Sequence, residues 1–228
     1  MNAEQGIPKA ADPLPQSVLF CCDHNAVRSP MAEGIMKRLY GMGCYVQSAG
    51  VKNDLEIDGF AIAVCQEIGV ELSRHRVRSL DDMRDWGDDL TSFDRVIALT
   101  PASLHRALEL TRSFAIQVEY WPILDPTGMG EGREERLGYY RKTRDMILAR
   151  IVDTFGPGRS GWAPPGTDEV YYRAASSAVH RVPPPRVPEE QREAAERLVD
   201  GVRARRSSAD DVVLSLALES ALDAMLGR

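Results

Sequence analysis

Short apolar runs alternate with amphipathic segments along the first two thirds of the chain. Four runs are continuous enough to be strands buried on both faces, at residues 17–22, 45–49, 94–100 and 117–122. Four further segments have the pattern of helices, at residues 30–40, 58–68, 101–110 and 134–155. This alternation predicts an α/β fold, with a four-stranded parallel sheet and helices on both faces in a flavodoxin-like three-layer sandwich.

The ends of two predicted helices carry recognisable signals. Ser29 is placed to cap the helix at 30–40, and Pro30 suits its first turn. Gly69 follows the helix at 58–68 and is expected to end it. The segment from Cys22 to Ser29 therefore connects a buried strand to the start of a helix, where ligands bind in open α/β sheets.

The composition changes after Gly156. Seven of the 14 prolines lie between Pro157 and Pro188, which predicts a Pro-rich linker over 157–188. A helical extension is predicted over 189–228, and its apolar residues cover more than one helix face. We therefore divide the chain into a flexible segment at 1–16, one α/β domain at 17–156, the linker and the extension. The extension is the expected surface for a homodimer or a protein partner.

Charge and composition exclude several classes of protein. The 228 residues carry a formal net charge of −6, which argues against a nucleic-acid binder. No apolar stretch is long enough to span a membrane, and the first 16 residues contain no apolar run of a secretory signal. Four cysteines, at positions 21, 22, 44 and 65, form no CxxC pair. We therefore expect a cytoplasmic protein with reduced thiols, no metal site and no cofactor, in which Cys44 and Cys65 are small buried residues.

The string from Cys22 to Ser29 has the composition of a phosphate-binding loop around a cysteine nucleophile. A thiolate is the form that attacks phosphorus, and a helix N-terminus supplies N–H groups and a favourable dipole for an anion. Five residues separate Cys22 from Arg28, whose planar guanidinium matches two phosphate oxygens. Ser29 is placed to donate its hydroxyl to the sulfur when the sulfur departs.

The stretch VLFCCDHNAVRSPMAEG resembles the opening of the low-molecular-weight protein tyrosine phosphatase family. The family pattern is a hydrophobic strand, C-x5-R-S and then P-[IM]-A-E, and the resemblance extends from about Ser17 to Phe155. It implies hydrolysis of a phosphomonoester, in a phosphorylated protein or a small molecule, through a phosphocysteine intermediate. Cys22, Arg28 and Asp125 are then the expected catalytic residues.

The resemblance also assigns the residues around the nucleophile. Asp125, followed by Pro126, matches the general acid that protonates the leaving oxygen and then activates water. Asn25, Ser48 and His75 match the residues that brace the loop. The loop positions expected to bind substrate are Asp23, His24, Asn25, Ala26, Val27 and Ser29.

Two departures from the family pattern bear on the substrate. Asp23 and His24 replace a Leu-Gly or Thr-Gly pair, so that a carboxylate lies beside the anion site. No aromatic residue directly follows Asp125-Pro126, where the family builds a wall for phosphotyrosine. The favoured interpretation is that Asp23 points to solvent. If His24 is protonated, it would offset the Asp23 charge. The alternative is that Asp23 recognises a cationic substrate such as phosphoarginine.

Other functions remain open at this point. Arsenate reductases share the scaffold but need further cysteines to relay a disulfide, and residues 78–95 contain none. A phospho-binding or interaction module is the alternative from another class, although it has no need of a general acid. A Cys21–Cys22 disulfide is not expected to protect the nucleophile, because neighbouring strand residues point to opposite faces.

Overall fold

The sheet forms from the four apolar runs, and all of its strands are parallel. The strands are β1 (Ser17–Cys22), β2 (Tyr45–Gly50), β3 (Arg95–Ala98) and β4 (Gln117–Tyr120), in the spatial order β2-β1-β3-β4. The computed structural model describes residues 13–88, 90–111 and 116–156, together with residues 158, 160 and 162. Within them the predicted α/β sandwich with a four-stranded parallel sheet is confirmed.

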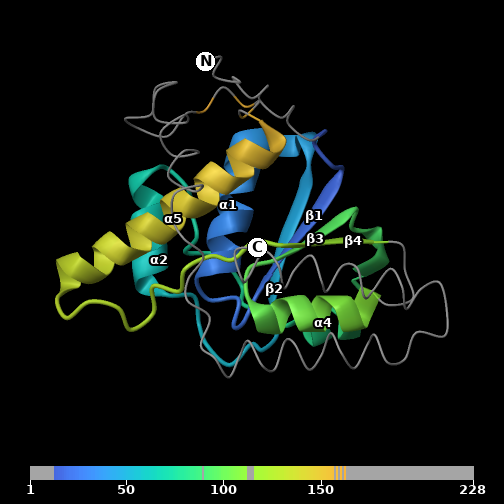
Figure 1. Ribbon diagram of the computed structural model, residues 1–228, viewed down its shortest axis with the longest axis horizontal. Coiled ribbons are helices and arrows are strands. Elements are labelled where there is room, and N and C mark those ends of the chain that lie inside the picture. Colours follow the sequence, from blue (N-terminus) through green and yellow to red (C-terminus); the bar gives the residue numbers. More distant parts are fainter. Residues whose placement is uncertain are drawn as a thin grey trace, which may run out of the picture.

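Helices cover both faces of this sheet (Figure 1). Helices α1 (Arg28–Tyr40), α2 (Gly59–Glu67) and α5 (Arg133–Phe155) pack on one face, and α3 (Leu80–Asp85) and α4 (Pro101–Thr111) pack on the other. Two short 3₁₀ turns, η1 (Gly41–Gly43) and η2 (Leu90–Ser92), precede β2 and β3. Side chains of β1 enter the two cores alternately, Phe20 on the α1 face and Leu19 on the other. Because both faces of β1 are buried, its sequence is an unbroken apolar run.

The central position of β1 fixes where the cysteine loop begins. All six of its residues are buried, and it pairs with β2 on one side and β3 on the other. Cys22, its last residue, is in register with Gly50 at the end of β2. The loop therefore leaves the sheet at the carboxyl edge, between the ends of two neighbouring strands.

Two features of the helices differ from the sequence-based prediction. Helix α1 begins at Arg28, and its N-cap residue Val27 makes no side-chain capping bond. The prediction that Ser29 caps the helix was therefore wrong, because Ser29 lies within the first turn. Helix α3 was not predicted at all, although Ser79 and Asp82 form a reciprocal capping box at its start.

The chain returns to the C-terminal end of α1 after α5 ends at Phe155. The Tyr40 hydroxyl donates to the Gly156 carbonyl at 2.6 Å. Ser160 donates its hydroxyl to the Arg38 carbonyl at 2.7 Å and its N–H to the Leu39 carbonyl at 3.0 Å. These bonds satisfy carbonyls that the helix end leaves without an internal partner.

The remainder of the predicted linker at 157–188, and the predicted helical extension at 189–228, lie outside the described residues. The expected homodimer or partner surface lies there too, and so does the segment at 1–12. Among the residues that are described, no helix is both long enough and apolar enough to cross a membrane.

Candidate active site

The segment from Cys22 to Val27 is held by backbone bonds to the chain that follows β2. The carbonyls of Cys22 and Asp23 accept hydrogen bonds from the N–H groups of Val51 and Lys52, at 2.9 and 2.8 Å. The Ala26 carbonyl accepts from Asp58 N–H at 3.0 Å. With these carbonyls turned outward, N–H groups of the loop are available to an anion at the N-terminus of α1, where the helix dipole favours negative charge.

Gly50 allows this close approach of β2 to the loop. A Cβ atom at Gly50 would lie 2.3 Å from the Lys52 carbonyl oxygen and 2.8 Å from the Asn25 backbone nitrogen. Both are backbone atoms, which cannot move aside as the end of a flexible side chain can. The absence of a side chain at Gly50 is therefore a condition for the observed loop position.

The Cys22 sulfur lies against the Ser29 hydroxyl, with Sγ and Oγ 3.0 Å apart. Asn25 Nδ2 donates to the same Ser29 oxygen at 3.0 Å, so the hydroxyl hydrogen of Ser29 is left for another acceptor. The candidate acceptors are Cys22 Sγ and the Ala49 carbonyl, the latter at 3.3 Å. A thiolate at Cys22 has no hydrogen of its own, so it would take the one that Ser29 offers.

Asn25 organises the interior of the loop in a left-handed backbone conformation, with a φ of 54°. Its Oδ1 accepts the Arg78 N–H at 3.1 Å, which fixes the orientation of the amide. The two Nδ2 hydrogens then go to Ser29 and Ser48, the latter at 2.8 Å. Asn is one of the few residues enriched in left-handed backbone, and only an amide supplies this combination of donors and acceptor.

The brace continues from Ser48 to Glu33 in α1. Ser48 accepts from Asn25 and donates its own hydrogen to Glu33 Oε2 at 2.6 Å. Because a carboxylate only accepts, the Ser48 hydroxyl hydrogen goes to Glu33, and the Ser48 oxygen accepts from the Asn25 amide. The same amide donates to Ser29, so the Ser29 hydrogen is left for Cys22 Sγ or the Ala49 carbonyl.

His75 closes the brace from the chain between α2 and α3. Its Nε2 lies 3.0 Å from Asn25 Oδ1, and since that oxygen is an acceptor, Nε2 carries the hydrogen. The other ring nitrogen lies 3.8 Å from Glu33 Oε2. Burial lowers the pKa of His75 below its ordinary value, and the nearby Glu33 carboxylate opposes that shift.

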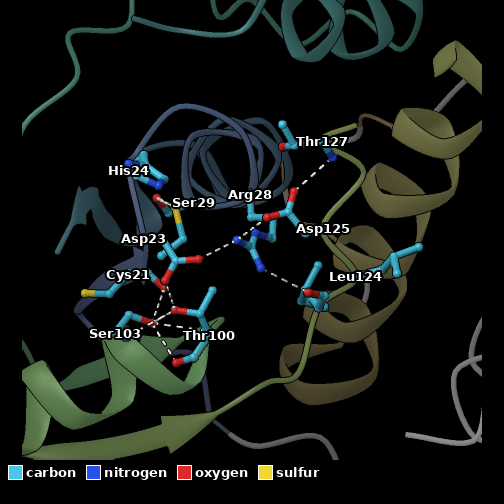
Figure 2. A network of polar contacts seen from close by, with 12 residues as sticks. Cys21, Asp23, His24, Arg28, Ser29, Thr100, Ser103, Leu124, Asp125 and Thr127 are labelled. Carbon is cyan, nitrogen blue, oxygen red and sulfur yellow. Dashed lines mark hydrogen bonds and ion pairs between the residues drawn. The ribbon is translucent and has the colours of Figure 1, made fainter. Parts of the chain in front are cut away.

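Arg28 lies between two carboxylates in Figure 2. Its Nη2 donates to Asp23 Oδ2 at 2.7 Å and to Asp125 Oδ2 at 2.8 Å, and its Nη1 donates to the Ile123 carbonyl at 3.4 Å. The guanidinium is buried, with 9% of the side chain exposed, whereas Asp125 is 46% exposed. Asp125 Oδ1 also accepts the Thr127 N–H at 2.9 Å, which orients the carboxylate toward the loop.

Asp23 does not simply point to solvent, as the favoured interpretation of the sequence had it. One of its oxygens binds Arg28, and the other accepts a hydrogen bond from the Thr100 hydroxyl at 2.8 Å. The imidazole of His24 is paired with Asp54, whose Oδ1 lies 2.6 Å from its Nδ1. The carboxylate of Asp23 is paired with Arg28.

The structure brings together the residues that the sequence singled out, except that the imidazole of His24 pairs with Asp54. Cys22, Arg28 and Asp125 meet at the carboxyl edge of the sheet, with Ser29 beside the sulfur and the Asn25, Ser48 and His75 brace behind it. Ala26 and Val27 are buried in the loop.

Three neighbours of the site were missed from the sequence. Glu33 belongs to the P-M-A-E string, and its place in that family pattern was the available signal. Thr100 follows β3 directly, at the same sheet edge as the loop. Tyr120 ends β4 near Arg28 and Asp23, and burial raises its pKa to about 12, so its hydroxyl stays protonated. The electrostatic effect of Asp23 adds to that shift, and Arg28 opposes it.

The other three cysteines are free and buried. Cys21 points into the core on the opposite face of β1 from Cys22. Burial raises the pKa of the Cys21 thiol strongly, that of Cys44 to about 11 and that of Cys65 to about 12. The expectation that Cys44 and Cys65 are small buried residues is confirmed. Among the described residues, no group of three or more His, Cys, Asp or Glu side chains is placed to hold a metal ion.

The fold and the loop define a class of protein with a cysteine and an arginine on a strand-to-helix turn of a parallel sheet. A family model described as low molecular weight phosphotyrosine protein phosphatase matches residues 17–154. The chain belongs to that family.

The relatives of the chain carry different activities in their names. An arsenate reductase of Bacillus subtilis (strain 168) is 26% identical over 142 residues, which cover 62% of this chain and 96% of the relative. An arsenate reductase of Staphylococcus aureus (strain N315) is 29% identical over 136 residues, covering 60% and 93%. A solved low molecular weight protein tyrosine phosphatase from T. tengcongensis is 28% identical, with a TM-score of 0.49, covering 60% of this chain and 96% of that one.

Proposed function

We propose that this protein is a cysteine-dependent phosphatase that hydrolyses a phosphomonoester, such as protein phosphotyrosine, through a phosphocysteine intermediate. The observation that carries the proposal is the meeting of Cys22, Arg28 and Asp125 at one sheet edge. These groups supply a nucleophile, a binding group for phosphoryl oxygens and a proton donor. The buried brace of Asn25 and Ser48 holds the loop in the geometry that this chemistry needs.

In the first step, the Cys22 sulfur attacks phosphorus, and the bond to the leaving oxygen breaks as the S–P bond forms. Arg28 turns from the carboxylates onto two phosphoryl oxygens and balances their charge. Asp125, released from Arg28, donates a proton to the leaving oxygen. This proton is needed because an unprotonated alkoxide or phenoxide is a poor leaving group.

In the second step, Asp125 takes a proton from water, and the water oxygen attacks phosphorus. The S–P bond breaks, inorganic phosphate forms and the electron pair returns to sulfur. Ser29 donates its hydroxyl hydrogen to the departing sulfur, which the direction of the brace favours. The cycle needs no oxidant, reductant or metal ion.

Hydrolysis of aryl phosphates by matched variants tests this proposal. We expect Cys22→Ser to abolish turnover of para-nitrophenyl phosphate, and Cys44→Ser, a cysteine remote from the loop, to retain it. Asp125→Ala should slow hydrolysis of phenyl phosphate by about 10² or more, the contribution of a general acid. The loss should be smaller with para-nitrophenyl phosphate, whose leaving group needs protonation less. Equal losses of the hydrolysis rate on both substrates would show that Asp125 is not the general acid.

Arsenate reduction is a second candidate, because the chain resembles proteins named arsenate reductase. Reduction of arsenic(V) to arsenic(III) takes two electrons, which two thiols supply by forming a disulfide. Cys21 is the neighbour in sequence, but it lies on the other face of β1. Cys44 and Cys65 are buried in the core, so an external thiol would have to react with Cys22.

A phosphoarginine substrate and a phospho-binding module are the remaining candidates. Asp23 already binds one guanidinium, that of Arg28, which is the observation in favour of phosphoarginine. A binding module would hold phosphate in the loop without turnover.

One set of assays separates these candidates. The wild type is given para-nitrophenyl phosphate, phosphotyrosine and phosphoarginine peptides, and arsenate with glutathione. Arsenite formation without phosphate release would establish the reductase, and phosphate binding without either reaction would establish the binding module. A preference for phosphoarginine that Asp23→Leu abolishes would establish the arginine substrate.

A further inference from the structure

The guanidinium that should bind phosphate is already occupied by anions of the protein itself. Both hydrogens of Arg28 Nη2 are used, one by Asp23 and one by Asp125, at 2.7 and 2.8 Å. Asp125 has a proposed role in proton transfer. Asp23 has no part in the two proposed chemical steps, and the family pattern does not call for a carboxylate at this position.

Asp23 is held in this position from the far side of the site. Its Oδ1 accepts the hydrogen of Thr100 Oγ1, and the same Thr100 oxygen accepts the N–H of Ser103 in the first turn of α4. Ser103 donates in turn to the Cys21 carbonyl at 3.0 Å. The carboxylate therefore rests on a bonded frame that joins β1 to α4, as Figure 2 shows.

We propose that Asp23 is an internal competitor for phosphate: its carboxylate occupies Arg28 in the free enzyme and must give it up when a phosphoryl group binds. The inference rests on the proposed role of Arg28 in binding phosphoryl oxygens. Binding exchanges one charge-assisted hydrogen bond for others, so the net gain from the arginine is smaller than in a loop without this acid.

The exchange of Asp23 for phosphate on Arg28 can run in both directions. Asp23 is 33% exposed, so its freed oxygen can be hydrated while Thr100 keeps hold of the other. When product phosphate leaves, the carboxylate is still next to Arg28 and takes its place. Asp23 thus weakens the affinity for inorganic phosphate and speeds its release.

The test is direct calorimetric titration of the wild type and its variants with inorganic phosphate, which requires no turnover. Asp23→Asn keeps an acceptor for Thr100 but loses the charge, and it should bind phosphate about tenfold more tightly, the effect of weakening one charge-assisted bond. Asp23→Leu, which removes the bond altogether, should tighten binding at least as much. Thermal unfolding of both variants verifies that each is folded.

Asp54→Asn is the matched control, since it removes one negative charge from the chain beside the loop but contacts His24 and not Arg28. It should change phosphate affinity by less than about twofold, because exposed charges are screened. Unchanged or weaker binding by the Asp23 variants would overturn the proposal, as would equal tightening by Asp54→Asn. The proposal would also be overturned if neither the wild type nor any of the three variants bound phosphate. Tighter binding by Asp23→Asn in a protein without phosphatase activity would uphold it while rejecting the proposed function.

Discussion

At the scale of single residues, Asn25 carries the most constraints in the site. It adopts a φ of 54° and it is fully buried. The hydrogen bonds of its side-chain amide link Ser29, Ser48, His75 and Arg78. A substitution acts in two ways, because it changes both the backbone preference and the brace. The two effects can be separated by comparing alanine with glycine.

We expect Asn25→Ala to lower the free energy of unfolding by about 3 kcal/mol, from lost buried hydrogen bonds and a side chain in left-handed backbone. Asn25→Gly should lose less stability, since glycine accepts this φ. Both should lose most of the hydrolysis of para-nitrophenyl phosphate, because neither orients Ser29. Chemical denaturation and steady-state kinetics measure the two effects.

Asn53→Ala is the control for that pair, since Asn53 is an exposed asparagine that binds Asp82 at 2.7 Å. It should stay within about 0.5 kcal/mol of the wild type, as surface changes usually do. If Asn25→Gly kept wild-type activity, the brace would not be what positions Ser29.

The sequence was sufficient to single out residues that local spacing or the family pattern marks. Cys22, Arg28 and Asn25 lie within one loop, and Ser48, His75 and Asp125 follow from the family pattern. It was not sufficient for Asp23, because its partner Thr100 lies 77 residues away at the end of another strand. Glu33 was missed for a similar reason, since its burial depends on the contact between α1 and Ser48.

At the scale of elements, β2 approaches the loop closely at Gly50. Gly50 ends β2 in register with Cys22, and a side chain there would meet backbone on two sides. A change at Gly50 therefore reaches the nucleophile through the backbone alone, with no catalytic group altered.

We expect Gly50→Ala to lower the free energy of unfolding by about 1–3 kcal/mol, the usual effect of overpacking. Activity should fall at the same time, because the Asn25 nitrogen is one of the atoms that must shift. Gly59→Ala, in the first turn of α2 with open space around it, should be neutral or stabilising by up to about 1 kcal/mol. Equal stability of the two variants, measured by urea denaturation, would contradict this account.

The strands were predictable from sequence because burial on both faces demands unbroken apolar runs. Helix α3 was not, since its six residues complete fewer than two turns and give no clear period. The start of α1 was misplaced because serine is a residue type that often caps helices. In the structure, the Ser29 hydroxyl lies 3.0 Å from the Cys22 sulfur and does not cap the helix.

At the scale of the whole molecule, the partly buried His75 links proton binding to stability. Burial lowers the pKa of His75 below 6.5 in the folded state. As the pH falls through about 6.5, the unfolded chain therefore takes up this proton before the folded protein does. The stability that neutral His75 contributes is complete above that pH and is lost as the pH falls toward the lower, folded-state pKa.

We expect the free energy of unfolding of the wild type to fall more steeply than that of His75→Gln between about pH 7.5 and about pH 5.5, one unit on either side of an ordinary His pKa. Glutamine does not titrate but can still donate to Asn25. His105→Gln, at an exposed position of α4, should keep the wild-type slope. Chemical denaturation at several pH values measures these slopes. If the free energy of unfolding of His75→Gln ran parallel to that of the wild type, our account would be wrong.

The two ends of α1 have different neighbours, because the chain that follows α5 returns to its C-terminal end. Helix α1 has 13 residues, so its two ends lie roughly 20 Å apart at 1.5 Å per residue. The loop from Cys22 to Val27 lies at one end, and Ser160 lies at the other, with Trp162 stacked under Arg38. A dye or a sensor surface attached at residue 162, in place of the indole, would therefore leave the loop open to solution.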